Sequence, residues 1–203
     1  REVFTVAKAI STAAVMSRNR VSLGVGIGWE REEFDLMSQD FKKRGRRCDE
    51  MIEVMRLLWQ GGIVEHHGEF YDFGPLSMSP APTEPVPIYI SGYSEPALRR
   101  AARLGDGWIV GPLGDDAPYN WDDLPKLVER LNEYRREVGR EDLPFEILQP
   151  AYDYHDLDFY HHLEDCGVTS VSVIIGDPVS PPSLEAQREK MMEFADTIIT
   201  KME

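Results

Sequence analysis

The sequence predicts an α/β fold built on a parallel sheet, because short apolar strands alternate with amphipathic helices along most of the chain. Two architectures fit this alternation, an open doubly wound sheet and an incomplete eight-stranded barrel, and periodicity alone does not separate them. The composition is that of a globular protein: 42% of the 203 residues are hydrophobic and 29% are charged. We therefore expect a single domain over residues 1–203.

The elements follow from the spacing of apolar residues. Five runs that are short and apolar are expected to be strands, at residues 20–28, 86–91, 107–110, 145–149 and 168–175. Helices are expected where apolar residues recur every three or four positions, at residues 3–14, 43–59, 95–104, 123–138, 157–166 and from 184 onward. Gly61-Gly62 should end the second helix. Residues 61–86 form an excursion, a hairpin turning at Gly68 and then a proline-rich stretch.

The charge and the absence of targeting signals limit the class of protein. A formal net charge of −14 argues against a nucleic-acid partner, which would need a concentrated basic face. No apolar run approaches the roughly 20 residues that cross a bilayer, so no membrane partner is expected. Two separated cysteines suit a reducing, cytoplasmic compartment. The chain opens inside a helical pattern without an initiator Met, so we expect an N-terminal piece to be missing.

The segment PVPIYISGYSEPA reads as a strand, a tight turn and a helix start. Gly92 permits a positive φ or a close backbone approach, Ser94 suits the N-cap, and Pro96 suits the first helical turn. Unpaired N–H groups and the positive end of the helix dipole favour a bound phosphate at such a start. An ordinary turn whose serine only caps the helix is the alternative from turn chemistry.

Other motifs are weaker. The run Gly24-Val25-Gly26-Ile27-Gly28-Trp29 lacks the spacing of a dinucleotide fingerprint, but its glycines suggest that something presses close to the strand. The pairs His66-His67 and His161-His162 lack metal-ligand spacing, so no metal site is expected. Arg99, Arg100 and Arg103 are expected to form a solvated helix face near the turn, and the alternative is that they meet an acidic ligand tail.

Taken in order, four segments resemble the luciferase-like monooxygenase superfamily, and in particular its deazaflavin-dependent oxidoreductase branch. They are RVSLGVGIGWEREEF, RGRRCDEMIEVMRLLW, HGEFYDF and PVPIYISGYSEPALRRAARLGDGWI. The resemblance runs essentially from end to end. It implies a (β/α)8 TIM barrel of the bacterial-luciferase type, incomplete at its N-terminus, with the site at the C-terminal strand ends.

The resemblance also implies a flavin-type cofactor, coenzyme F-420 or FMN. Its phosphate would be held by the turn comprising Ser91, Gly92, Tyr93, Ser94 and Ala97. Its ring would lie over a floor that includes Gly26 and Gly28. The catalytic candidates at the mouth of the barrel are Trp29, Glu30 and His155.

Three functions stay open at this point. The first is an oxidoreductase that uses reduced coenzyme F-420 for hydride transfer with a small organic substrate. The second is an FMN-dependent luciferase-like monooxygenase. The third is a catalytically silent flavin-binding or partner protein. The unpaired strand edges of an incomplete barrel need a covering partner, and a homodimer is expected.

Overall fold

A computed structural model describes residues 2–113, 118–151, 156–174 and 182–202. The chain divides into two compact units, residues 1–90 and 91–203, which we describe separately. The single domain expected from the sequence stays a prediction. None of the described helices is both long enough and apolar enough to cross a membrane.

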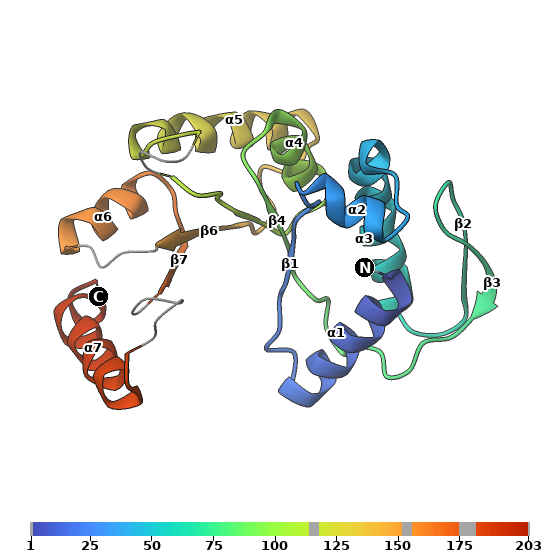
Figure 1. Ribbon diagram of the computed structural model, residues 1–203, viewed down its shortest axis with the longest axis horizontal. Coiled ribbons are helices and arrows are strands. Elements are labelled where there is room, and N and C mark those ends of the chain that lie inside the picture. Colours follow the sequence, from blue (N-terminus) through green and yellow to red (C-terminus); the bar gives the residue numbers. More distant parts are fainter. Residues whose placement is uncertain (1, 114–117, 152–155, 175–181, 203) are drawn as a thin grey trace. The chain divides into compact units, whose positions relative to one another are not determined.

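The first unit contains two parallel strands, a helix pair and a hairpin (Figure 1). Its elements are α1 (Val3–Ser17), β1 (Leu23–Val25), α2 (Arg31–Leu36), the 3-10 helix η1 (Phe41–Lys43), α3 (Arg44–Trp59), β2 (Val64–His67), β3 (Asp72–Leu76) and β4 (Ile88–Ser91), which reaches the unit boundary. Leu23 lies opposite Ile88 in the parallel pair of β1 and β4. Helices α1 and α3 pack against each other, and the buried Trp59 indole donates a 2.9 Å hydrogen bond to the Ala7 carbonyl.

The antiparallel hairpin β2–β3 is held to α3 by the carboxylate of Glu50. This carboxylate accepts the backbone N–H groups of Phe70, at 3.0 and 3.1 Å, and Tyr71, at 2.8 Å. It also lies 3.2 Å from His66 Nε2. The turn occurs at Gly68, as predicted, and its N–H donates to the Tyr71 carbonyl. A Cβ at Gly68 would overlap the Glu50 carboxylate, so a close approach explains the glycine.

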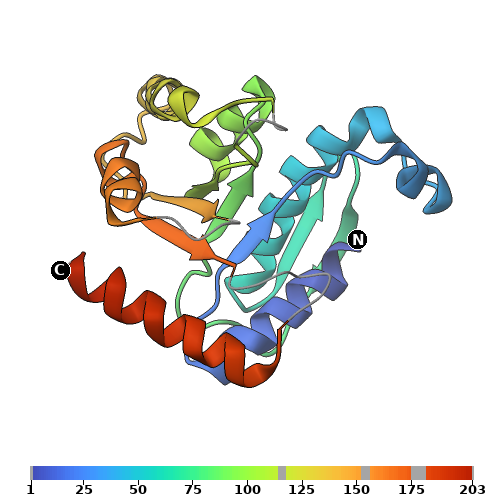
Figure 2. The same ribbon diagram turned by 60° about the vertical axis from the view of Figure 1, so that its left-hand side comes forward.

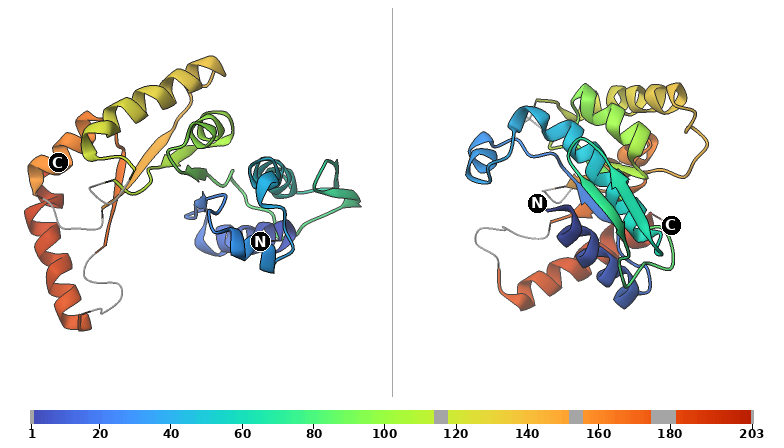
Figure 3. Two further views of the ribbon diagram at one scale, coloured as in Figure 1. Left: turned by 45° about the horizontal axis from the view of Figure 1, so that its top comes forward. Right: turned by 90° about the vertical axis from the view of Figure 1, so that its right-hand side faces the viewer.

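The second unit is a parallel βα arrangement. Its elements are α4 (Glu95–Leu104), β5 (Gly107–Ile109), the 3-10 helix η2 (Trp121–Asp123), α5 (Leu124–Glu137), β6 (Glu146–Ala151), α6 (Leu157–Asp165), β7 (Ser170–Val173), α7 (Leu184–Thr197) and the 3-10 helix η3 (Ile199–Lys201). Strand β6 pairs in parallel with both β5 and β7, and Figure 2 shows β6 and β7 side by side. Helices α4 and α5 pack together (Figure 3), which buries Ala101, Leu131 and Tyr134.

The predicted strands and helices are present, with two differences in detail. The first strand is only three residues long, so residues 20–22 and 26–28 lie outside it, contrary to the prediction. Helix α2 was not expected, because its six residues bury only Phe34 and show no apolar periodicity. Helix α3 ends before Gly61 and Gly62 as predicted, and both glycines have positive φ values, 73° and 76°.

Candidate cofactor-binding site

The predicted phosphate turn connects β4 to α4, and its backbone is fixed at Gly92. The Gly92 N–H donates to the Ile109 carbonyl at 3.3 Å, which ties the turn to the neighbouring strand β5. On the other side of the residue, the Gly92 carbonyl accepts a 2.7 Å hydrogen bond from the indole Nε1 of Trp108. Trp108 is fully buried, so this carbonyl has a fixed partner. The sequence places Trp108 in the expected strand at residues 107–110, and nothing local links it to Gly92.

Glycine is required at position 92 for two reasons. Its φ of +115° lies in the region that side chains disfavour. A Cβ at this position would also lie 3.2 Å from the Cβ of Ala97, which is buried in the first turn of α4. The prediction of a positive φ at Gly92 is therefore confirmed. The small side chain of Ala97 allows the turn to lie this close to the helix.

The Tyr93 side chain is packed within the second unit. Its ring covers Gly111, where a Cβ would overlap the ring atoms. It also makes an edge-to-face contact with Tyr119, with ring centroids 4.9 Å apart and planes at 68°. Aromatic packing within the second unit thus fixes the position of the Tyr93 side chain.

Ser94 occupies the N-cap position of α4, as predicted, with φ −66° and ψ 151°. Its side chain makes no capping hydrogen bond, however, which differs from the capping role considered for it. Its carbonyl accepts the N–H groups of Ala97, at 2.8 Å, and Leu98, at 3.0 Å. Pro96 has no N–H. The donors that this helix start can offer an anion are therefore the Ser94 hydroxyl and the Glu95 N–H.

The other predicted cofactor residues, Gly26 and Gly28, belong to the first unit. Gly28 has a φ of +79°, and a Cβ there would lie 3.0 Å from the Phe34 ring, which matches the expected close approach. Gly26 does not match it, because a Cβ there would meet nothing within 4 Å. Instead, Gly26 lines a cavity of about 780 Å³ together with Ile27, Phe34 and Arg44. Cavities of this size suit small-molecule ligands.

The catalytic candidates differ in what surrounds them. Trp29 follows Gly28 and is 82% exposed. Glu30 precedes α2, and a hydrogen bond shared with Glu32, then slight desolvation and the charge of Glu33, raise the pKa of its carboxyl above the ordinary value. His155 lies outside the residues that the structure describes. The catalytic roles of Trp29, Glu30 and His155 therefore stay predictions.

Two further expectations concern charged groups. Arg100 is buried, contrary to the expected solvated face, and its guanidinium lies 3.5 Å from the Pro96 carbonyl. Arg99 is half exposed and makes ion pairs with Glu95 and Glu137. In the part of the chain that the structure describes, no three His, Cys, Asp or Glu side chains are grouped to hold a metal ion.

Comparison with known proteins decides the family. The profile of the luciferase-like monooxygenase family matches residues 1–152. The chain belongs to this family. An uncharacterized protein of Mycobacterium tuberculosis is 42% identical over 201 residues, covering 97% of this chain and 67% of that protein. The chain thus spans about two thirds of the length of this luciferase-like relative.

The chain is also similar to a second named relative and to a solved structure. A protein of Segniliparus rotundus named coenzyme F-420-dependent glucose-6-phosphate dehydrogenase is 32% identical over 151 residues, covering 73% of this chain and 45% of that protein. The solved structure of coenzyme F-420-dependent tetrahydromethanopterin reductase from Methanopyrus kandleri matches with a TM-score of 0.77 at 16% identity. That match covers all of this chain and 80% of the reductase. The fold is therefore that of the luciferase-like TIM barrels, as the sequence predicted.

Proposed function

We propose that this luciferase-like protein is an oxidoreductase that uses reduced coenzyme F-420 for hydride transfer with a small organic substrate. The observation that carries the proposal is the turn at residues 91–97, with a positive-φ glycine, a helix start and an N-cap serine whose hydroxyl makes no capping hydrogen bond. The 32% identity to a coenzyme F-420-dependent dehydrogenase supports the choice of cofactor.

The turn fits the cofactor phosphate. The Ser94 hydroxyl and the Glu95 N–H donate to it, and Gly92 lets the backbone approach closely. We assign Ser91, Tyr93 and Ala97 to the walls of this turn, and Gly26 and Gly28 to the floor beneath the ring. The cofactor supplies the hydride when it is bound.

The residues beside the ring have separate roles in this proposal. Trp29 offers an exposed aromatic surface for the substrate. We assign to the carboxyl of Glu30, which precedes α2 and follows Trp29, the exchange of a proton with the substrate. His155 stays a catalytic prediction. The homodimer and the cytoplasmic location also stay predictions. Sedimentation would test the homodimer.

Titration of the purified protein with coenzyme F-420 and with FMN, followed by fluorescence, tests the proposal. Tight binding of FMN without binding of coenzyme F-420 would contradict it. That outcome favours the alternative, an FMN-dependent monooxygenase, which the family profile supports. Oxygen uptake that depends on a flavin reductase would then identify the monooxygenase.

A serine variant tests the assignment of the turn. Ser94→Ala removes a donor without removing a helix cap, so folding is unchanged while the dissociation constant of the bound cofactor rises about tenfold or more. Ser172→Ala is the matched control, because Ser172 is an exposed serine of β7. Equal affinities of the two variants would show that Ser94 does not bind the phosphate.

A further inference from the structure

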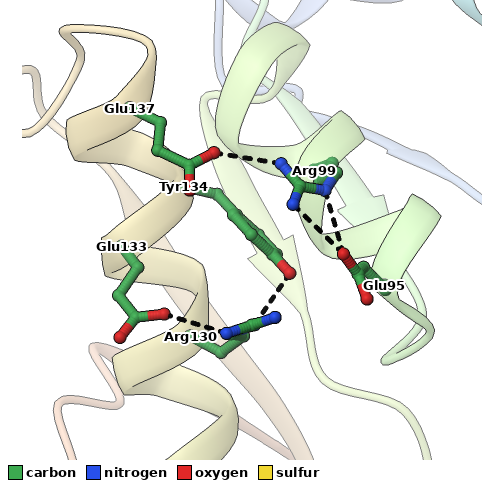
Figure 4. Close-up of polar contacts among 6 residues, drawn as sticks. All are labelled: Glu95, Arg99, Arg130, Glu133, Tyr134 and Glu137. Carbon is green, nitrogen blue, oxygen red and sulfur yellow. Dashed lines mark hydrogen bonds and ion pairs between the residues drawn. The ribbon is translucent and has the colours of Figure 1, made fainter.

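A network of ion pairs joins the start of α4 to α5 (Figure 4). The Arg99 guanidinium donates to one Glu95 oxygen through Nε, at 3.2 Å, and Nη2, at 3.1 Å. Its Nη1 donates to Glu137 at 3.0 Å. The guanidinium also lies over the Tyr134 ring, 3.9 Å from its centroid. Arg99 is thereby held between the two helices by a carboxylate on each and by an aromatic face.

Tyr134 continues the network to a second arginine. Its ring is buried, and its hydroxyl accepts a 2.7 Å hydrogen bond from Arg130 Nε. Arg130 is in turn paired with Glu133 at 3.2 Å. Hydrogen bonds from the Tyr134 hydroxyl and then from Arg99 hold the pKa of the Glu95 carboxyl below its ordinary value. Glu95 is therefore a carboxylate anion at neutral pH.

The position of the Glu95 carboxylate is unfavourable for phosphate binding at the turn. Glu95 is the first residue of α4, directly after Ser94, and its own N–H is one of the donors of the turn. A carboxylate in the first turn interacts favourably with the positive end of the helix dipole, but it repels a phosphate bound at the same helix start. The side chain must be held away from the turn, or neutralised, for the turn to accept an anion.

We propose that Arg99 is a positioning residue for phosphate recognition: together with the Tyr134 hydroxyl it holds Glu95 against α5, and its guanidinium supplies the positive charge that neutralises this carboxylate beside the turn at residues 91–97. This inference rests on the proposed function, because it assumes that the turn binds a phosphate. In this proposal, Arg99 is the reason that the site prefers a phosphorylated cofactor to the same ring system without a phosphate.

The solvent exposure of the Arg99–Glu95 pair distinguishes a role in anion binding from a role in folding. The Arg99 and Glu95 side chains are 50% and 57% exposed, and exposed ion pairs contribute little to stability. Tyr134 and the apolar contacts between α4 and α5 stay in place when Arg99 changes. The structure therefore predicts that a substitution at Arg99 alters the binding of anions more than the fold.

The test compares ligands that differ only in the phosphate. Dissociation constants of FMN and riboflavin, or of coenzyme F-420 and its phosphate-free ring, are measured for the wild type, Arg99→Gln and the double variant Arg99→Gln/Glu95→Gln. We expect Arg99→Gln to weaken the phosphorylated ligand about three- to tenfold, with a smaller loss at high salt. The phosphate-free ligand should bind equally well to both proteins. Arg136→Gln is the matched control, because it removes the same charge from an exposed position on α5.

The double variant gives the decisive outcome. Restored affinity in Arg99→Gln/Glu95→Gln supports the proposal, because the carboxylate that Arg99 no longer neutralises is then gone. Equal weakening of phosphorylated and phosphate-free ligands, or no rescue, would overturn it. If neither cofactor binds the wild type, the proposed function fails. Inorganic phosphate, followed through the amide signals of Gly92 and Glu95, then tests Arg99 by itself: an affinity unchanged by Arg99→Gln overturns the proposal.

Discussion

Replacing Glu50 by alanine removes the acceptor that holds the β2–β3 hairpin to α3. Three contacts are lost, from the N–H groups of Phe70 and Tyr71 and from His66 Nε2. The Glu50 side chain is only 11% exposed, so water replaces these contacts poorly. Each unpaired N–H costs about 1–3 kcal/mol, and we expect Glu50→Ala to lower the free energy of unfolding by about 2–4 kcal/mol.

The pH dependence of this contribution follows from the direction of the pKa shift. Burial of Glu50 raises its pKa, but the hydrogen bonds from Tyr71, Phe70 and His66 outweigh burial and leave the pKa below the ordinary value of a glutamate. The charged form is therefore favoured in the folded state. The resulting stability is fully present above pH 4.5 and is lost as the pH falls through the folded-state pKa.

Urea denaturation followed by circular dichroism measures both effects. Glu50→Gln keeps the size of the side chain and removes the charge, so its deficit relative to the wild type should be largest near pH 7 and shrink toward pH 3. Glu53→Gln removes the same charge from an exposed position on α3 and should leave stability within about 0.5 kcal/mol of the wild type. A Glu50→Gln deficit that grows as the pH falls would refute this account of the hairpin.

Two further substitutions probe close contacts. Gly68→Ala places a Cβ where the Glu50 carboxylate lies, so it should lower the free energy of unfolding about as much as Glu50→Ala. In urea denaturation, the double variant should lose less stability than the sum of the two single losses. Full additivity of the two losses would contradict this explanation. Trp108→Phe leaves the Gly92 carbonyl without its indole donor, which should lower the unfolding free energy by about 1–3 kcal/mol and weaken cofactor binding. Unchanged affinity in a folded Trp108→Phe protein would show that the indole does not shape the turn.

The order of strands and helices could be predicted because each long element carries a complete apolar pattern. Helix α5, for example, buries Leu124, Leu127, Val128 and Leu131, a spacing that is visible in the sequence. The short helix α2 has no such pattern and was missed. Arg100 was misjudged because its neighbour Arg99 is exposed, and successive helix positions point in different directions.

The contacts that fix the site are less visible in sequence. Gly92 could be predicted as a special position, since its neighbours form a strand, a turn and a helix start. Its partner Trp108 could not, because 16 residues separate them and the bond joins a side chain to a backbone carbonyl. The bonds from Phe70 and Tyr71 to Glu50 are of the same kind, 20 and 21 residues apart. Such contacts depend on the tertiary packing of distant segments, and no local sequence preference predicts them.

The turn at Gly92 and the Trp29 side chain differ in how firmly their own surroundings hold them. The turn at Gly92 is fixed before any ligand binds, by the buried Trp108 indole on one side and by the Ile109 carbonyl on the other. A phosphate that enters it has little backbone to order, so most of the interaction energy contributes to affinity. Trp29, in contrast, is 82% exposed and lies outside any helix or strand. A ligand must order this side chain on binding, and substitutions at Trp29 should therefore change substrate preference with little effect on how the cofactor is held.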